Sequence, residues 1–198
     1  MRTPLLALLG LLFSPPFQDK DKDREPLLLT RTLLSRLPAG VVEGQFEISP
    51  EGRGAAMILL PGRTKIQVGD KESKEYSSIT RLAVLADGRP LFSAAKGRNF
   101  VVVAGEEEGI ESDSAMDFIV GPGGRRFAYG VYVPGGRRQV VVDQKGGDLY
   151  KSVGLPVFSP DGSRVAYSAE KGPRRFVMVV DGREGPEFSY VGSPVFSP

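Results

Sequence analysis

The feature that most constrains this chain is a sequence repeat. Residues 156–160 (PVFSP) return as residues 194–198, after a spacing of 38. Turn-like segments earlier in the chain (ISPEG, VLADG, VGPGG and FSPDG) follow the same rhythm, and their glycines lie 36, 36 and 38 residues apart. A repeat of this length is typical of supersecondary units that stack, because one such unit cannot bury its apolar face alone. The sequence therefore predicts an array of similar modules. The turn positions of this repeat are Gly52, Asp87, Gly88, Gly124, Pro160, Asp161 and Gly162.

The clearest unit, residues 156–193, has the pattern of four short antiparallel strands. Short apolar runs alternate with turn segments, of which 159–162 (SPDG) is the most typical. Proline presets φ in such a turn, and glycine adopts positive φ without steric cost. A break at 171–174 (KGPR) separates the second strand from the third. The four strands are expected at 157–158, 165–168, 176–180 and 188–191.

The preceding units show the same pattern. Residues 126–129 (RFAY) correspond to 164–167 (RVAY), and the apolar runs 140–142 and 100–103 correspond to the third strand. In the first unit, the second and third strands are expected at 56–60 and 66–69. The predicted units are 48–83, 84–119, 120–156 and 157–194, with a partial unit at 195–198.

Radial stacking of such four-stranded sheets forms a β-propeller, whereas the rungs of a β-solenoid are usually shorter than these units. The segments FSPDGSRVAYSA and VVVDGREGPEF resemble the WD-like repeats of TolB-type bacterial propellers, and the resemblance covers residues 46–198. The Trp-Asp pair of the parent repeat class is absent, since the chain has no Trp. The resemblance implies an all-β fold, a β-propeller of four-stranded antiparallel blades. Four blades and the start of a fifth rarely close a ring, so we expect a fragment of a larger propeller; alternatively, N-terminal strands complete a closing blade.

The N-terminal residues 1–17 have the pattern of a secretory signal peptide. Arg2 precedes an apolar run of nine residues at 5–13, which is too short to span a bilayer. The expected location is therefore periplasmic or secreted, without a membrane span. A buried N-terminal segment is the alternative interpretation, because residues 14–17 (SPPF) offer no small-residue cleavage site.

Residues 18–45 are expected to form a charged linker followed by a short amphipathic helix between Pro26 and Pro38. The spacing of Asp19, Asp21 and Asp23 resembles the start of a calcium-binding loop. However, Arg24 stands where such a loop needs glycine, so no metal site is predicted.

Composition narrows the chemistry available to the chain. Its 198 residues include no Cys and no His, which excludes thiolate or imidazole zinc sites, Cys nucleophiles and Ser-His pairs. The net charge of +2 is too small to indicate nucleic-acid binding. Residues 93–96 (SAAK) match a Ser-x-x-Lys pattern, but they lie at a predicted strand end rather than on a helix. We therefore expect a protein that is not an enzyme and has no catalytic residues, no cofactor and no metal.

Charge is distributed unevenly among the predicted turns. Turns between third and fourth strands are acidic, with Glu75, Glu108 and Glu187 as examples. Because alternate turns emerge at opposite edges of a blade, the sequence predicts one basic and one acidic face. The basic residues of the second-to-third turns are Arg63, Lys65, Lys96, Arg98, Arg137, Arg138, Lys171, Arg174 and Arg175.

The predicted function is that of a non-catalytic binding or scaffolding module of the bacterial cell envelope. The basic turns would bind a protein or peptide, or another anionic partner, and a small ligand is also compatible with this surface. A plainer interpretation is that the turns are simply solvated and that repeats inherit the same residues. The functional alternative is the propeller domain of a prolyl-oligopeptidase-like serine peptidase whose catalytic domain is not in this chain.

Overall fold

The computed structural model describes residues 41–48, 52, 54–114 and 117–197. The predicted signal peptide (1–17), the calcium-like spacing and the predicted helix lie outside the described residues, as does Pro198. Four antiparallel sheets follow one another along the described chain, and we call them blades 1 to 4.

Each of the first three blades contains four strands in chain order. Blade 1 consists of β1 (Val41–Ile48), β2 (Gly54–Leu60), β3 (Arg63–Val68) and β4 (Lys71–Glu72). Blade 2 consists of β5 (Ser78–Val84), β6 (Pro90–Lys96), β7 (Asn99–Ala104) and β8 (Glu107–Glu108). Blade 3 consists of β9 (Ile119–Val120), β10 (Phe127–Val133), β11 (Arg137–Val142) and β12 (Lys145–Gly146), with a short 3-10 turn, η1 (Pro122–Gly124), after β9.

Blade 4 differs in its first strand, which is interrupted. Both β13 and β14 pair with β15, so together they occupy the place of one strand. The blade consists of β13 (Ser152–Val153), β14 (Val157–Phe158), β15 (Val165–Gly172), β16 (Arg175–Val180) and β17 (Arg183–Phe188).

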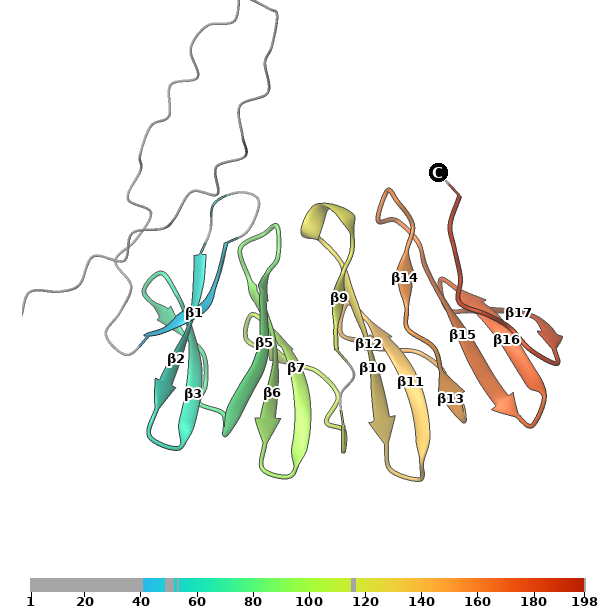
Figure 1. Cartoon of the computed structure of the whole chain (residues 1–198), viewed down its shortest axis with the longest axis horizontal. Coiled ribbons are helices and arrows are strands. Elements are labelled where there is room, and N and C mark those ends of the chain that lie inside the picture. Colours follow the sequence, from blue (N-terminus) through green and yellow to red (C-terminus); the bar gives the residue numbers. More distant parts are fainter. Residues whose placement is uncertain (1–40, 49–51, 53, 115–116, 198) are drawn as a thin grey trace, which may run out of the picture. The chain divides into compact units, whose positions relative to one another are not determined.

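The four blades lie side by side in chain order, and the hairpins between second and third strands all turn at one edge (Figure 1). We call this edge, which is lower in Figure 1, the hairpin edge. It is formed by residues 60–63, 96–99, 133–137 and 172–175. The third-to-fourth turns and the first-to-second turns of blades 2 to 4 lie at the opposite edge.

Apolar cores lie between successive blades and account for the stacking. Phe92, Val101 and Val103 of blade 2 pack against Met57 and Ile66 of blade 1. Equivalent strands of blades 3 and 4 supply the next two cores, with Tyr129 and Tyr167 at matching positions. Removing this apolar surface from water drives the association of the sheets. The prediction of an all-β fold built from four-stranded antiparallel blades, as in part of a β-propeller, is confirmed.

Several predicted boundaries need correction. Strand β1 begins at Val41, inside the segment expected to be linker and helix. Strand β5 begins at Ser78, ahead of the predicted unit boundary at residue 84. The fourth strand of blade 4 is Arg183–Phe188 rather than 188–191. Asp181 and Gly182 both have positive φ, which closes a two-residue turn, so pairing with β16 resumes at once.

The predicted turn glycines adopt the expected conformation. Gly52, Gly88, Gly124 and Gly162 have φ values of 80°, 85°, 68° and 71°. Gly162 is further constrained by close packing, because a Cβ atom there would lie 2.8 Å from the carbonyl oxygen of Pro122 in blade 3. A glycine at this position thus permits both the turn and the approach of blade 4 to blade 3.

Candidate binding site along the hairpin edge

The nine predicted basic residues lie on the hairpin edge or on the strands leading into it. Only Arg98 and Arg174 are in the turns themselves. The others belong to β3, β6, β11, β15 and β16, and Arg63, Arg137 and Arg175 each begin a strand. Most of the nine side chains are exposed, whereas Lys65 and Arg138 are half-buried.

The expected separation of basic and acidic faces is wrong. Arg63 pairs with Glu75 at 2.7 Å, Lys96 with Glu108 at 2.9 Å, and Arg175 with Glu187 at 2.9 Å. The physical reason is that the chain runs back beside the third strand after each third-to-fourth turn. Acidic residues only a few positions beyond that turn therefore reach the hairpin edge.

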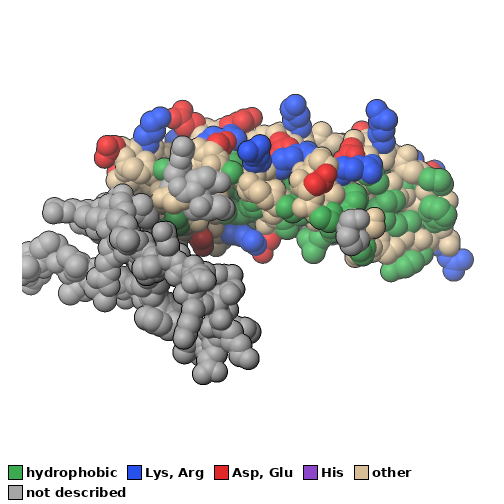
Figure 2. All heavy atoms as spheres, turned by 90° about the horizontal axis from the view of Figure 1, so that it is seen from above, with side chains coloured by type: hydrophobic (Ala, Val, Ile, Leu, Met, Phe, Trp, Pro, Cys, Tyr) green, Lys and Arg blue, Asp and Glu red, His purple; other side chains and the backbone are tan. Residues whose placement is uncertain are grey.

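The opposite edge also carries both signs of charge. Arg126 pairs with Asp143, and Arg164 pairs with Asp181, each at 2.8 Å. Asp143 and Asp181 also accept hydrogen bonds from the backbone N–H groups of Phe127 and Val165. Figure 2 looks onto this edge and shows blue and red side chains intermixed along it.

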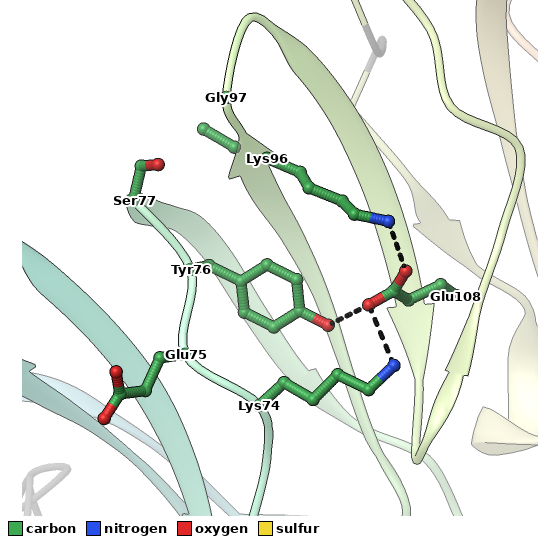
Figure 3. A pocket seen from close by; sticks show the side chains of 8 residues that line it. Lys74, Glu75, Tyr76, Ser77, Lys96, Gly97 and Glu108 are labelled. Atoms are coloured by element: carbon green, nitrogen blue, oxygen red, sulfur yellow. Dashed lines mark hydrogen bonds and ion pairs between the residues drawn. The ribbon is translucent and has the colours of Figure 1, made fainter.

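An open pocket of about 320 Å³ lies between blades 1 and 2 at the hairpin edge. Three side chains converge on Glu108 there (Figure 3). The Tyr76 hydroxyl donates a hydrogen bond to Glu108 Oε1 at 3.1 Å, and Lys74 Nζ lies 3.3 Å from the same oxygen. Lys96 Nζ binds the other oxygen, Oε2, and also donates to Glu111 at 2.7 Å. Tyr76 and Lys74 belong to blade 1, so this cluster joins two blades.

The cluster shifts the pKa values of its members. The hydrogen bond from Lys96, aided by those from Tyr76 and Lys74, lowers the pKa of Glu108 below its usual value. Hydrogen bonds to Glu111 and Glu108 raise the pKa of Lys96, and burial followed by the contact with Glu108 raises that of Tyr76. The carboxylate and the ammonium are therefore both charged at neutral pH, and the phenol is protonated. The pocket therefore presents charged and hydrogen-bonding side chains, which suit a polar ligand.

The same arrangement recurs between blades 3 and 4. Tyr150 donates a hydrogen bond to Glu184 at 3.0 Å, and Lys171 binds the other oxygen of that carboxylate at 2.7 Å. Between blades 2 and 3, Ser112 occupies the position of the tyrosine and Gly146 that of the glutamate. The Ser112 hydroxyl is buried and has no hydrogen-bond partner among the residues that the structure describes.

The basic residues predicted from the sequence lie along the hairpin edge, but the prediction did not include the two tyrosines that form contacts between blades there. The sequence predicts no role for Tyr76 and Tyr150, although they lie at the same repeat position two units apart. A glutamate follows each tyrosine after 32 or 34 residues, close to one repeat length. That spacing was the available signal for contacts between neighbouring blades.

Comparisons with known proteins find similarity among solved structures. No protein-family model and no curated protein matches the chain. Among solved structures, TolB from Acinetobacter baumannii is similar with a TM-score of 0.42, 20% sequence identity and coverage of 78% of this chain. Virginiamycin B lyase from Staphylococcus aureus is similar with a TM-score of 0.37, 15% identity and 73% coverage. The chain spans 44% and 54% of the lengths of these two chains.

The described residues contain neither a helical membrane span nor a cluster of metal ligands. No helix in this part of the chain is long and apolar enough to cross a bilayer. No group of three or more acidic side chains in the same part is arranged to hold a metal ion.

Proposed function

We propose that the chain is a non-catalytic binding module of the bacterial cell envelope whose hairpin edge binds an anionic segment of a partner protein. The observation that supports this function is the repetition of exposed cations along one edge of four successive blades. The pocket between blades 1 and 2 opens on the same edge. An extended partner segment could contact several blades at once along such a row.

The ion pairs on the edge do not prevent this function. Exposed ion pairs contribute little to stability, so a partner carboxylate can share or replace an internal one at low cost. The cations remain accessible in their pairs, since the side chains of Arg63 and Arg175 are 67% and 59% exposed. Placement in the periplasm or outside the cell follows from the predicted signal peptide and is part of the same proposal.

Binding of a fluorescent polyglutamate peptide to the full chain tests this function. We expect binding that weakens as salt is raised, because ions screen contacts between exposed charges. The fourfold variant Arg137→Glu, Arg138→Glu, Arg174→Glu and Arg175→Glu should lose most of the affinity and most of the salt dependence.

The control variant reverses charges at the opposite edge. Arg125 and Lys145 are exposed there, and neither makes an ion pair with another described residue. The double variant Arg125→Glu, Lys145→Glu should keep wild-type binding. Unchanged binding by the fourfold variant would overturn the proposal, as would a clear preference of the chain for phosphatidylglycerol vesicles over the peptide.

A further inference from the structure

Blade 3 lacks the acidic residues that neutralise the hairpin edge of the other blades. In blades 1, 2 and 4, the residue twelve positions after the start of the third strand is Glu75, Glu111 or Glu187. Each of these glutamates accepts a hydrogen bond from the residue that begins that strand. The residue at this position in blade 3 is Leu149. The second glutamate position, occupied by Glu72, Glu108 and Glu184 elsewhere, is Gly146 in blade 3.

These two replacements leave the cations of blade 3 without carboxylates. Arg137 donates a hydrogen bond to the backbone carbonyl of Leu149, and neither Arg137 nor Arg138 forms an ion pair with any described residue. A carbonyl carries no net charge, so the guanidinium retains its attraction for an incoming carboxylate. Arg137 is exposed, which leaves it open to a partner.

An aromatic ring lies beside Arg138 and an exposed apolar residue beside Arg137, on the two faces of the blade at its hairpin edge. The Leu149 side chain is 47% exposed, although it borders the well-packed strand β11. The Arg138 guanidinium lies 4.1 Å from the centre of the Tyr132 ring, which holds it over the aromatic face. Arginine and tyrosine are enriched among the residues that contribute most to binding at protein interfaces.

The acidic residue nearest to Leu149 in sequence, Asp148, acts on the interface between blades 3 and 4. Asp148 precedes Leu149, and its charge acts on the tyrosines between blades 3 and 4. Burial, and then the Asp148 charge, raises the pKa of Tyr167 to about 12.

We propose that the partner segment is acidic and partly apolar, and that it docks on blade 3 at Arg137, Arg138, Tyr132 and Leu149. This inference rests on the proposed function, since it names the blade and the chemistry through which the hairpin edge binds. Carboxylates of the segment would pair with the two arginines, and an apolar side chain would cover Leu149. The remaining blades would contribute mainly long-range attraction, because most of their hairpin-edge cations already have carboxylate partners. Arg98 and Arg174 form no ion pair with a described residue, but their blades carry the glutamates that blade 3 lacks.

The test compares two peptides and three variants of the full chain. A peptide of alternating glutamate and leucine should bind more tightly than polyglutamate, and Leu149→Ala should remove that difference. Leu149→Glu restores the carboxylate found in the other three blades and should weaken binding about tenfold or more, comparable to the loss of one strong contact. Arg137→Glu with Arg138→Glu should have at least that effect.

The matched control is Arg98→Glu with Arg174→Glu, which changes the net charge equally on the neighbouring hairpins of blades 2 and 4. We expect it to weaken binding only slightly, and thermal melting should show that all variants remain folded. Equal losses from both double variants would overturn docking on blade 3 and leave binding at the hairpin edge intact. Failure of both peptides to bind the wild-type chain would instead refute the proposed function, and this inference with it.

Discussion

The interface between blades 2 and 3 differs from the two interfaces on either side of it. Between blades 1 and 2, and again between blades 3 and 4, a tyrosine of the earlier blade donates to a glutamate of the later one. Between blades 2 and 3, the side chain that donates hydrogen bonds belongs to the later blade instead. Gln144 Nε2 of blade 3 donates to the backbone carbonyls of Val102 and Glu107, at 3.1 Å each.

This comparison shows that one repeat can join its neighbours in two ways. The Gln144 side chain is held by the Tyr129 hydroxyl, which donates to Gln144 Oε1 at 2.6 Å. The corresponding position in blade 4 is Gly182, which has no side chain to extend across the interface. The polar contact near the hairpin edge is therefore replaced, in the middle interface, by a contact from the third-to-fourth turn.

The largest expected effect comes from placing a methyl group in the middle interface. A Cβ atom at Gly109 would lie 2.2 Å from Tyr129 Oη and 2.6 Å from Gln144 Oε1. Tyr129 is fully buried and cannot move aside cheaply. Gly109→Ala should therefore lower the free energy of unfolding by about 1–3 kcal/mol, as overpacking does in other cores. This loss is measured by urea unfolding, monitored by far-UV circular dichroism.

The equivalent glycine of blade 3 supplies the control. A Cβ atom at Gly147 would lie 3.1 Å from the Val140 carbonyl oxygen and 3.2 Å from Tyr167 Oη, distances that small shifts can relieve. Gly147→Ala should therefore lower the free energy of unfolding by less than about 1 kcal/mol. Equal destabilisation by the two variants would contradict the difference between the interfaces.

The sequence was sufficient to predict the blades because their signals are local. Turn glycines and apolar runs recur within each unit, and the strands containing 56–60, 100–103, 140–142, 165–168 and 176–180 lie where these signals place them. The contacts between blades join residues far apart in sequence, such as Tyr76 with Glu108 and Gln144 with Val102. Which residues meet between blades depends on how the sheets pack. The composition of the turns alone therefore led to the wrong prediction of one basic and one acidic face.

Removing a tyrosine hydroxyl from an outer interface should have a smaller effect. In Tyr150→Phe, the ring keeps its packing against Tyr167 and Glu184 keeps its pair with Lys171. Only one hydrogen bond to a charged acceptor is lost, so the free energy of unfolding should fall by about 1 kcal/mol. Tyr76→Phe should behave similarly in the first interface. Tyr190→Phe is the control, since this side chain is 76% exposed. An unchanged stability of Tyr150→Phe would show that the hydrogen bond has no net value.

Acid should weaken the charged contacts of blade 4, including its contact with blade 3, by a still smaller amount. The hydrogen bond from Lys171 lowers the pKa of Glu184, and that from Arg175 lowers the pKa of Glu187 to about 2. A carboxylate whose pKa is lower in the folded state stabilises the fold above the pKa of the unfolded chain, near 4.5, and loses that contribution as the pH falls toward 2. Stability measured by urea unfolding should therefore decline over this range, and Glu184→Gln should reduce the slope. The effect is small because exposed ion pairs are weak.

The control is Glu106→Gln, which removes an exposed carboxylate that has no ion partner among the described residues. This variant should keep the wild-type dependence of stability on pH. If it reduced that dependence as much as Glu184→Gln does, the Tyr150–Glu184–Lys171 contact would have no special role in acid sensitivity.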